Sequence, residues 1–198
     1  MNPSMYVPRH FRTPDQQTGL ALIDQIGFGD MTSLIDGQMH CTAMPFLRDG
    51  DYLLGHLARA NPQAAFQPGA EVQVTFAGPH GYVSPGWYQA PGVPTWNYVA
   101  VHVYGVPEIL TDAQAVHDLL ARLTAKYESG LANPWQPDYD PRQLNAIVAF
   151  RLPIARLDTK LKLSQNRSAE DRAGVIAGLR AVGNTALADL MQVREDQA

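Results

Sequence analysis

The stretch Tyr52-Leu53-Leu54-Gly55-His56-Leu57-Ala58-Arg59-Ala60-Asn61-Pro62 joins an apolar run to a polar turn. The run Tyr52-Leu53-Leu54 predicts a buried strand, and a second strand-like run extends from Glu71 to Ala77. Between the two runs lie the imidazole of His56, the guanidinium of Arg59 and the carboxamide of Asn61. A strand that opens onto a turn with Arg and exposed amides is a good anion holder. The same pattern also fits an ordinary connection with a solvated Arg.

Short strands joined by tight turns surround this stretch. Three glycine-containing turns separate them, at Asp36-Gly37, Asp49-Gly50 and Pro68-Gly69. The strands are predicted at residues 31–35, 39–47, 52–56, 71–77, 98–106 and 147–157. Pro45 indicates an edge or a bulge in the second strand, because proline has no N–H to donate to a ladder. Such a meander favours a closed or sandwiched β core.

Helical patterns lie on either side of the strands. Leu20, Ile23 and Ile26 form one apolar stripe that ends before Gly27. A second helix is predicted between Asp112 and Gly130, with Thr111 as the alternative cap. Two more helices are predicted after residues 168 and 184. Residues 78–98, GPHGYVSPGWYQAPGVPTWNY, predict a long loop whose aromatic rings either stack on a planar ligand or cap the end of the barrel.

Composition predicts one folded domain that spans residues 1–198, since 45% of the residues are hydrophobic and 17% are charged. No apolar run approaches the ~20 residues of a membrane span. The N-terminus lacks the apolar core of a signal peptide, so we expect a cytoplasmic protein without membrane contact. The single cysteine, Cys41, excludes an intrachain disulfide and a cysteine-based structural zinc site.

Charge is unevenly distributed along the chain. The net charge is −4, so the protein as a whole is not a basic nucleic-acid binder. Residues 142–180 nevertheless hold eight Lys or Arg against three Asp or Glu, which is +5 and leaves −9 for the remainder. This segment fits phosphate groups of a cofactor or of DNA, and it equally fits a solvated surface.

Standard catalytic motifs are missing from the sequence, which contains no GxxxxGK[ST], GxGxxG, HExxH, GxSxG or CxxC. We therefore assign no catalytic residue and predict no metal site.

Five stretches together resemble the PaiB family of FMN-binding negative transcriptional regulators. They are MYVPRHF (5–11), GHLARANPQ (55–63), GPHGYVSPGWY (78–88), VPTWNYVAVHVYG (93–105) and KLSQNRSAEDRAGVI (162–176). The resemblance covers essentially the whole chain. It implies an α+β fold, an antiparallel, Greek-key-like split β-barrel with peripheral helices, similar to the pyridoxamine phosphate oxidase group. It further implies a homodimer with FMN in a groove at the interface.

The resemblance also implies candidate cofactor-binding residues. The segment from Leu54 to Asn61 corresponds to the part that lies against the flavin phosphate. Arg59 would supply a bidentate fork, and His56 and Asn61 lie in the same segment. The ring candidates are Trp96, Asn97 and Tyr98, followed by Ser84 and Trp87. The basic, polar cluster of Lys160, Lys162, Gln165, Asn166 and Arg167 suits a phosphate, a partner subunit or a salt-bridged turn.

Three functional readings follow. The first is an FMN-binding regulator, with DNA contact supported by residues 142–180. The second is an FMN-dependent oxidoreductase that uses a reduced nicotinamide, in which the flavin supplies the chemistry. The third is a barrel that has lost flavin and serves as a dimeric scaffold. The third reading rests on Ala43, which stands where family members commonly have a histidine two residues before the proline.

Overall fold

A computed structural model describes residues 5–13 and 15–196. The strands are β1 Phe28–Ile35, β2 Gln38–Pro45, β3 Leu47–Asp49, β4 Tyr52–Ala58, β5 Val72–Val83, β6 Thr95–Gly105, β7 Glu108–Ile109, β8 Ile147–Pro153 and β9 Arg156–Lys162. The α-helices are α1 Gln16–Ile26, α2 Ala113–Glu128, α3 Pro141–Asn145, α4 Ala169–Ala181 and α5 Thr185–Asp196. Three short 3-10 helices are η1 Arg9–Phe11, η2 Pro62–Ala65 and η3 Pro85–Trp87. No described helix is long and apolar enough to cross a membrane.

The chain forms two compact units, each assembled from separate segments. Unit 1 comprises Met1–Leu22, Ala77–Val101 and Asp158–Ala198. Unit 2 comprises Ile23–Phe76 and His102–Leu157. The strands belong to two sheets, with the orders β2-β1-β5-β6-β9 and β3-β4-β8-β7. The mixed α and β content with antiparallel strand pairs agrees with the predicted fold class.

The β1–β2 hairpin in unit 2 follows from its turn. Its ladder runs from Phe28 opposite Pro45 to Ile35 opposite Gln38. Asp36 and Gly37 both have positive φ, 50° and 77°, as the tight turns that match strand twist require. β2 lies at the edge of its sheet, which confirms the position that Pro45 indicated.

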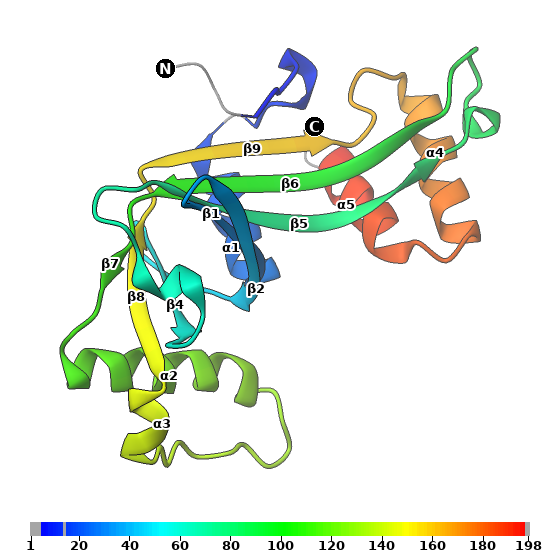
Figure 1. The fold of residues 1–198 in the computed structure, drawn as a ribbon. Coiled ribbons are helices and arrows are strands. Elements are labelled where there is room, and N and C mark those ends of the chain that lie inside the picture. The colour runs from blue at the N-terminus through cyan, green and yellow to red at the C-terminus, as the bar shows by residue number, and fades with distance from the viewer. Residues whose placement is uncertain (1–4, 14, 197–198) are drawn as a thin grey trace. The chain divides into compact units, whose positions relative to one another are not determined.

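The core of unit 2 contains packed phenylalanine rings and one helix. Phe46 lies with its ring centroid 5.6 Å from that of Phe76 and 6.5 Å from that of Phe150, both edge-on. The helix α2 adds Leu119 and Leu120, which pack with Leu54 and Ala149 of the β4–β8 pair. Figure 1 shows α2 and α3 close to the β8 arrow.

The core of unit 1 follows from strand alternation. Val99 and Val101 of β6 and Leu161 of β9 are buried, while their neighbours along each strand are more exposed. The helices α4 and α5 pack side by side and contribute buried residues to this unit (Figure 1). These residues are Val175, Ile176, Leu179, Leu187, Ala188 and Met191.

The loop predicted over residues 78–98 is shorter in the structure. β5 continues to Val83 and β6 begins at Thr95, so both strands extend into the predicted loop. The register of β1 with β5 covers Gln73–Thr75, and Pro79 lies beyond it. A proline is tolerated there because it interrupts no part of that ladder.

The prediction of a single strand over residues 147–157 is wrong. The structure has two strands, β8 in the four-stranded sheet and β9 in the five-stranded sheet. Backbone N–H groups between them bond elsewhere, with Ile154 donating to the Asp51 carbonyl at 2.8 Å. The predicted strand 39–47 is likewise divided into β2 and β3. The helix α3 was missed, although Asp140 and Gln143 form a capping box at its start.

Gln63 is a buried amide that ties η2 to the β1–β2 hairpin within unit 2. It is 2% exposed. Its Nε2 donates to the Met31 carbonyl at 3.1 Å and to Ser33 Oγ at 2.9 Å, and Thr42 Oγ1 donates to its Oε1. A further bond reaches the His40 carbonyl at 3.3 Å. Because these partners come from both strands of the hairpin, one side chain holds the pair to the turn after β4.

We predict that Gln63→Leu lowers the free energy of unfolding by about 2–4 kcal/mol, because buried acceptors lose their donor. Chemical denaturation measures the change. Gln67→Leu is the matched control, since Gln67 is exposed four residues later, and we expect a change within about 0.5 kcal/mol. Equal losses in the two variants would contradict the role assigned to Gln63.

Candidate functional site

The sequence-predicted residues fall into two groups, one in each unit. His56, Arg59 and Asn61 belong to unit 2. The others belong to unit 1: Ser84, Trp87, Trp96, Asn97, Tyr98, Lys160, Lys162, Gln165 and Arg167.

Arg59 follows β4 directly and is engaged by the backbone. Its Nε donates to the Asn145 carbonyl at 2.7 Å, and its Nη2 donates to the Ile147 carbonyl at 2.8 Å. Its own N–H donates to the Ala146 carbonyl at 2.8 Å. The guanidinium therefore closes the C-terminal end of α3 at the start of β8. Contact with a flavin phosphate stays a prediction, and two of the three guanidinium nitrogens already have partners.

Asn61 and His56 differ in how their polar atoms are satisfied. Asn61 caps η2, because its Oδ1 accepts from Gln63 N–H at 2.9 Å, and its Nδ2 donates to Thr42 Oγ1 at 2.9 Å. His56 lies on β4 opposite Ala149, and its Nδ1 is buried without a hydrogen-bond partner among the described residues. Burial lowers the pKa of His56 below its ordinary value of 6.5, because desolvation disfavours the imidazolium.

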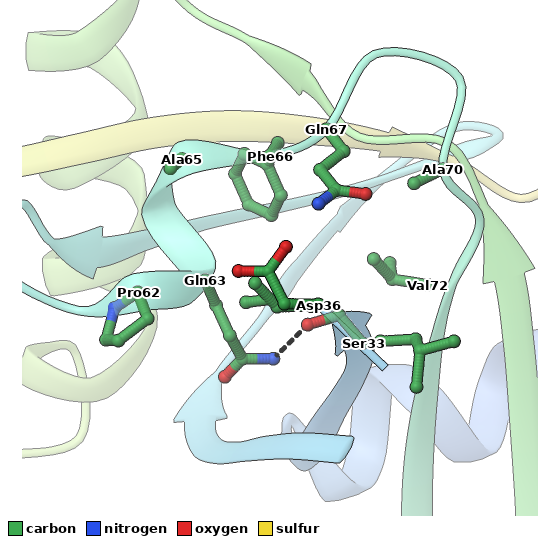
Figure 2. A pocket seen from close by; sticks show the side chains of 11 residues that line it. Ser33, Asp36, Pro62, Gln63, Ala65, Phe66, Gln67, Ala70 and Val72 are labelled. Carbon is green, nitrogen blue, oxygen red and sulfur yellow. Dashed lines mark hydrogen bonds between the residues drawn. The ribbon is translucent and has the colours of Figure 1, made fainter. Parts of the chain in front are cut away.

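A cavity of about 240 Å³ lies beside Gln63 in unit 2 and was not anticipated from the sequence. Figure 2 shows its lining side chains, with the Gln63 amide bonded to Ser33. Apart from Ser33, Gln63 and Gln67, its polar lining is the Asp36 carboxylate of the hairpin turn. Phe66, Val72, Leu34 and Ile35 are among its apolar residues.

The Lys162 pocket in unit 1 brings several predicted residues together. This cavity of about 130 Å³ is lined by Phe11, Tyr88, Val93, Thr95, Asn97, Lys162, Ser164, Asn166 and Arg167. Lys162 Nζ donates to Thr95 Oγ1 at 2.5 Å and to the Trp96 carbonyl. Burial, and after it the charge of Lys160, lowers the pKa of Lys162 below its ordinary value. The pocket therefore combines two basic groups with neutral polar side chains that include Thr95, Asn97, Ser164 and Asn166.

Asn97 forms the buried end of this pocket. It is 1% exposed, and its Nδ2 donates to Ser164 Oγ at 2.9 Å and lies 3.4 Å from Met191 Sδ. These bonds fix β6 to the segment after β9 and to α5. The predicted contact of Asn97 with a flavin ring is not tested by this arrangement.

Arg167 is held over an aromatic ring by the segment after η3. Its guanidinium carbon lies 4.2 Å from the Tyr88 ring centroid, and Nη1 donates to the Pro91 carbonyl at 3.4 Å. Asp171, which is 2% exposed, lies 3.9 Å from Arg167 and accepts from the N–H groups of Gln89 and Ala90 at 2.7 and 3.2 Å. Sequence reasoning missed Asp171, because its partners lie about eighty residues earlier in the chain.

Ser84, Trp87 and Gln165 have local structural contacts. Ser84 Oγ accepts from Gly86 N–H at 3.2 Å and caps η3. Trp87 packs so closely on Gly178 of α4 that an added Cβ would clash with its ring. Gln165 accepts from Leu163 N–H at 2.7 Å and donates to the Leu161 carbonyl at 2.6 Å.

Trp96 is an exposed residue of β6, whereas Tyr98 and Lys160 are half-buried. Trp96 is 53% exposed, and its ring centroid lies 6.3 Å from that of His80 and 6.5 Å from that of Tyr82. Lys160 Nζ lies 5.2 Å from the Tyr98 ring centroid. These rings form a stacking surface, and their contact with a flavin ring stays a prediction.

The family of this chain follows from its similarity to known proteins. Residues 5–156 match the model of the family described as "Putative FMN-binding domain". The chain belongs to this family. It is 33% identical over 98% of both chains to the "Protease synthase and sporulation protein PAI 2" of Bacillus subtilis. The predicted resemblance is confirmed.

Solved structures with the same fold include flavoproteins. The flavocytochrome Anf3 of Azotobacter vinelandii superposes with a TM-score of 0.68 at 19% identity, over 85% of this chain and 78% of that one. A "Putative Pyridoxamine 5'-phosphate oxidase" of Listeria innocua gives 0.50 at 17% identity, over 73% and 96%. These likenesses confirm the split-barrel fold predicted for the family.

We predict that the stability of unit 2 depends on the protonation of His56. As the pH falls below 6.5, the unfolded imidazole binds a proton that the folded one resists, so the free energy of unfolding decreases. His56→Leu should show a smaller decrease between about pH 7 and pH 5 in denaturation without added FMN.

His117→Leu is the control for this experiment, because it removes an exposed imidazole from α2. We expect it to retain the wild-type slope of stability against pH. A His56→Leu slope equal to that of the wild type would refute the assignment.

Proposed function

We propose that this protein is an FMN-binding regulator whose flavin phosphate is held by the Lys162 pocket. Membership of an FMN-binding family supports the cofactor. The observation that carries the location is the convergence of Lys162 and Arg167 on one cavity with neutral hydrogen-bonding side chains. A flavin phosphate is dianionic and binds best to charge-assisted donors. No catalytic step is assigned to the pocket.

The pocket fits one end of FMN. A cavity of about 130 Å³ accommodates a phosphate group but is too small for the tricyclic ring. Lys162 and Arg167 would hold the phosphate, with Thr95 and Asn166 as neutral partners. Bound FMN would supply a redox-active ring, and Trp96 and Tyr98 remain the candidates to contact it. His56, Arg59 and Asn61 are the alternative phosphate site.

A regulatory output is proposed from the relative and the resemblance. The relative of Bacillus subtilis is named for protease synthesis and sporulation. The resemblance implies a homodimer, and the small size of the Lys162 pocket supports a second subunit that completes the cofactor site. The oxidoreductase and flavin-free readings have no comparable support from the described residues.

The basic segment 142–180 offers little to a DNA backbone. Six of its eight basic side chains already have acidic partners: Arg142 with Asp140, Arg151 with Glu108, Arg156 with Glu71, Arg167 with Asp171, Arg172 with Glu195 and Arg180 with Asp189. Paired guanidinium groups release fewer counterions on meeting phosphates. We propose that regulation does not use this segment as a surface for duplex DNA.

A gel-shift titration against salt tests the proposal on DNA. We expect no retardation of a mixed-sequence duplex at about 50 mM salt, where phosphate contacts are strongest. Retardation that weakens steeply as salt rises, and that disappears when Lys160 and Arg167 are changed to Gln, would show direct contact through the segment.

FMN titration tests the cofactor site. We expect purified protein to bind FMN, seen in the flavin absorbance bands after dialysis. Arg167→Gln and Lys162→Gln should each weaken FMN binding at least about tenfold, because a hydrogen bond to a charged group contributes roughly 1.5–3 kcal/mol. Arg180→Gln is the matched control, since Arg180 is an exposed arginine of α4 outside the pocket.

Riboflavin separates contact with the phosphate from contact with the ring. If Lys162 and Arg167 hold the phosphate, both variants bind riboflavin as the wild type does. Equal weakening for FMN and riboflavin would move these residues to the ring. Loss of FMN in Arg59→Gln alone would place the phosphate in unit 2, and no flavin binding by the wild type would refute the proposal.

A further inference from the structure

A second cavity in unit 1, here called the Arg194 pocket, collects basic side chains around an apolar floor. It has a volume of about 300 Å³. The residues that matter are Arg12, Arg172 and Arg194, the acidic Glu195, and the floor residues Leu163 and Met191. We propose that this pocket binds a small dianionic ligand of the phosphate-monoester class, at a site separate from the flavin phosphate.

The charge of the pocket favours an anion. Three arginines against one glutamate leave a net charge of +2. Glu195 is already neutralised, because it accepts from Arg172 Nε at 2.6 Å and from Arg172 Nη2 at 2.8 Å. Arg172 Nη1 donates to the Arg167 carbonyl at 2.6 Å, so all three of its nitrogens are engaged. This bidentate pair forms a fixed wall of the pocket.

The other two arginines have donors to spare. Arg194 makes no hydrogen bond or ion pair with any part of the chain that the structure describes. The side chain of Arg12 donates from Nε to the Val7 carbonyl at 3.3 Å, and its two terminal nitrogens have no hydrogen-bond partner among residues 5–13 and 15–196. Two guanidinium groups with unused forks at one cavity match the two charges and several acceptor oxygens of a phosphate monoester.

The floor and the size of the pocket favour a small ligand. Leu163 is 3% exposed and Met191 is 1% exposed, so the base is apolar and firmly packed. An apolar base lowers the local dielectric and strengthens the attraction between the arginines and an anion. It also suits an apolar group attached to the phosphate. A cavity of about 300 Å³ is the size of a small-molecule site, whereas duplex DNA presents its phosphates on a convex surface.

The turn that follows β9 separates this pocket from the Lys162 pocket. Lys162, Ser164 and Asn166 line the Lys162 pocket, while Leu163 and Gln165 line the Arg194 pocket. The N-terminal segment divides in the same way, with Phe11 at the first pocket and its neighbours His10 and Arg12 at the second. Two anions can therefore occupy unit 1 together, one on each side of the segment that follows β9.

Phenyl phosphate is the probe, because it joins the required dianion to a small apolar group. Calorimetric titration at low ionic strength uses the full chain, with and without FMN. We expect binding in both states. Arg194→Gln and Arg12→Gln should each weaken it at least about tenfold, the effect of losing one charge-assisted partner. Arg180→Gln makes the same change elsewhere in unit 1, and we expect an effect below about twofold.

The outcomes distinguish the proposal from its alternatives. Circular dichroism reports whether each variant folds. If Arg194→Gln does not fold, the test uses Arg12→Gln. Equal weakening in Arg180→Gln would leave only general electrostatic attraction and overturn the site. Absence of binding at about 10 mM phenyl phosphate would also overturn it. Displacement of the probe by FMN would assign the pocket to the flavin, and displacement by duplex DNA would assign it to nucleic acid.

Discussion

The two-residue period of an extended chain is the constraint on which unit 1 depends. Along β9, successive side chains point to opposite faces of the sheet. Leu161 and Leu163 are thereby buried, and the lysines beside them are held at the surface of the core. After β9 the chain turns at Ser164, whose φ is 64°, and the residues of this turn are divided between two cavities. A shift of one residue in the register of β9 would exchange the two faces of this strand, so the packing of its apolar residues fixes where its lysines stand.

The sequence predicted those elements that local chemistry determines. The Asp36-Gly37 turn, the α2 stripe and the alternation of β5 and β6 are visible in short windows, and the structure contains all of them. The ends of strands were less predictable, because they depend on which strand lies beside them in the sheet. Pro79 suggests a loop by itself but is accommodated beyond the β1 register. The break after Pro153 depends on backbone bonds to residues some fifty or a hundred positions earlier.

In the candidate site too, the sequence indicates which residue types are present, whereas their partners depend on the fold. Basic and polar residues at the end of β9 and in the turn after it were expected to form a cluster, and Lys162 and Arg167 do line one cavity. Arg59 was expected to supply a bidentate fork to a phosphate, and in the structure two of its nitrogens bond carbonyl groups 86 and 88 residues away. Asp171 and Arg194 carried no local signal. Their importance depends on where β9, the N-terminal segment and the C-terminal helices meet, which no single stretch of sequence encodes.

The Gln63 amide has a consequence for motion as well as for stability. Its partners lie on β1 and β2, and the residue itself lies in η2, so none of the three segments can separate without breaking its bonds. Opening of the hairpin therefore carries with it the segment that closes the cavity of Figure 2. The segments β1, β2 and η2 should therefore open as one cooperative unit. Their backbone amide protons should exchange with solvent together rather than strand by strand.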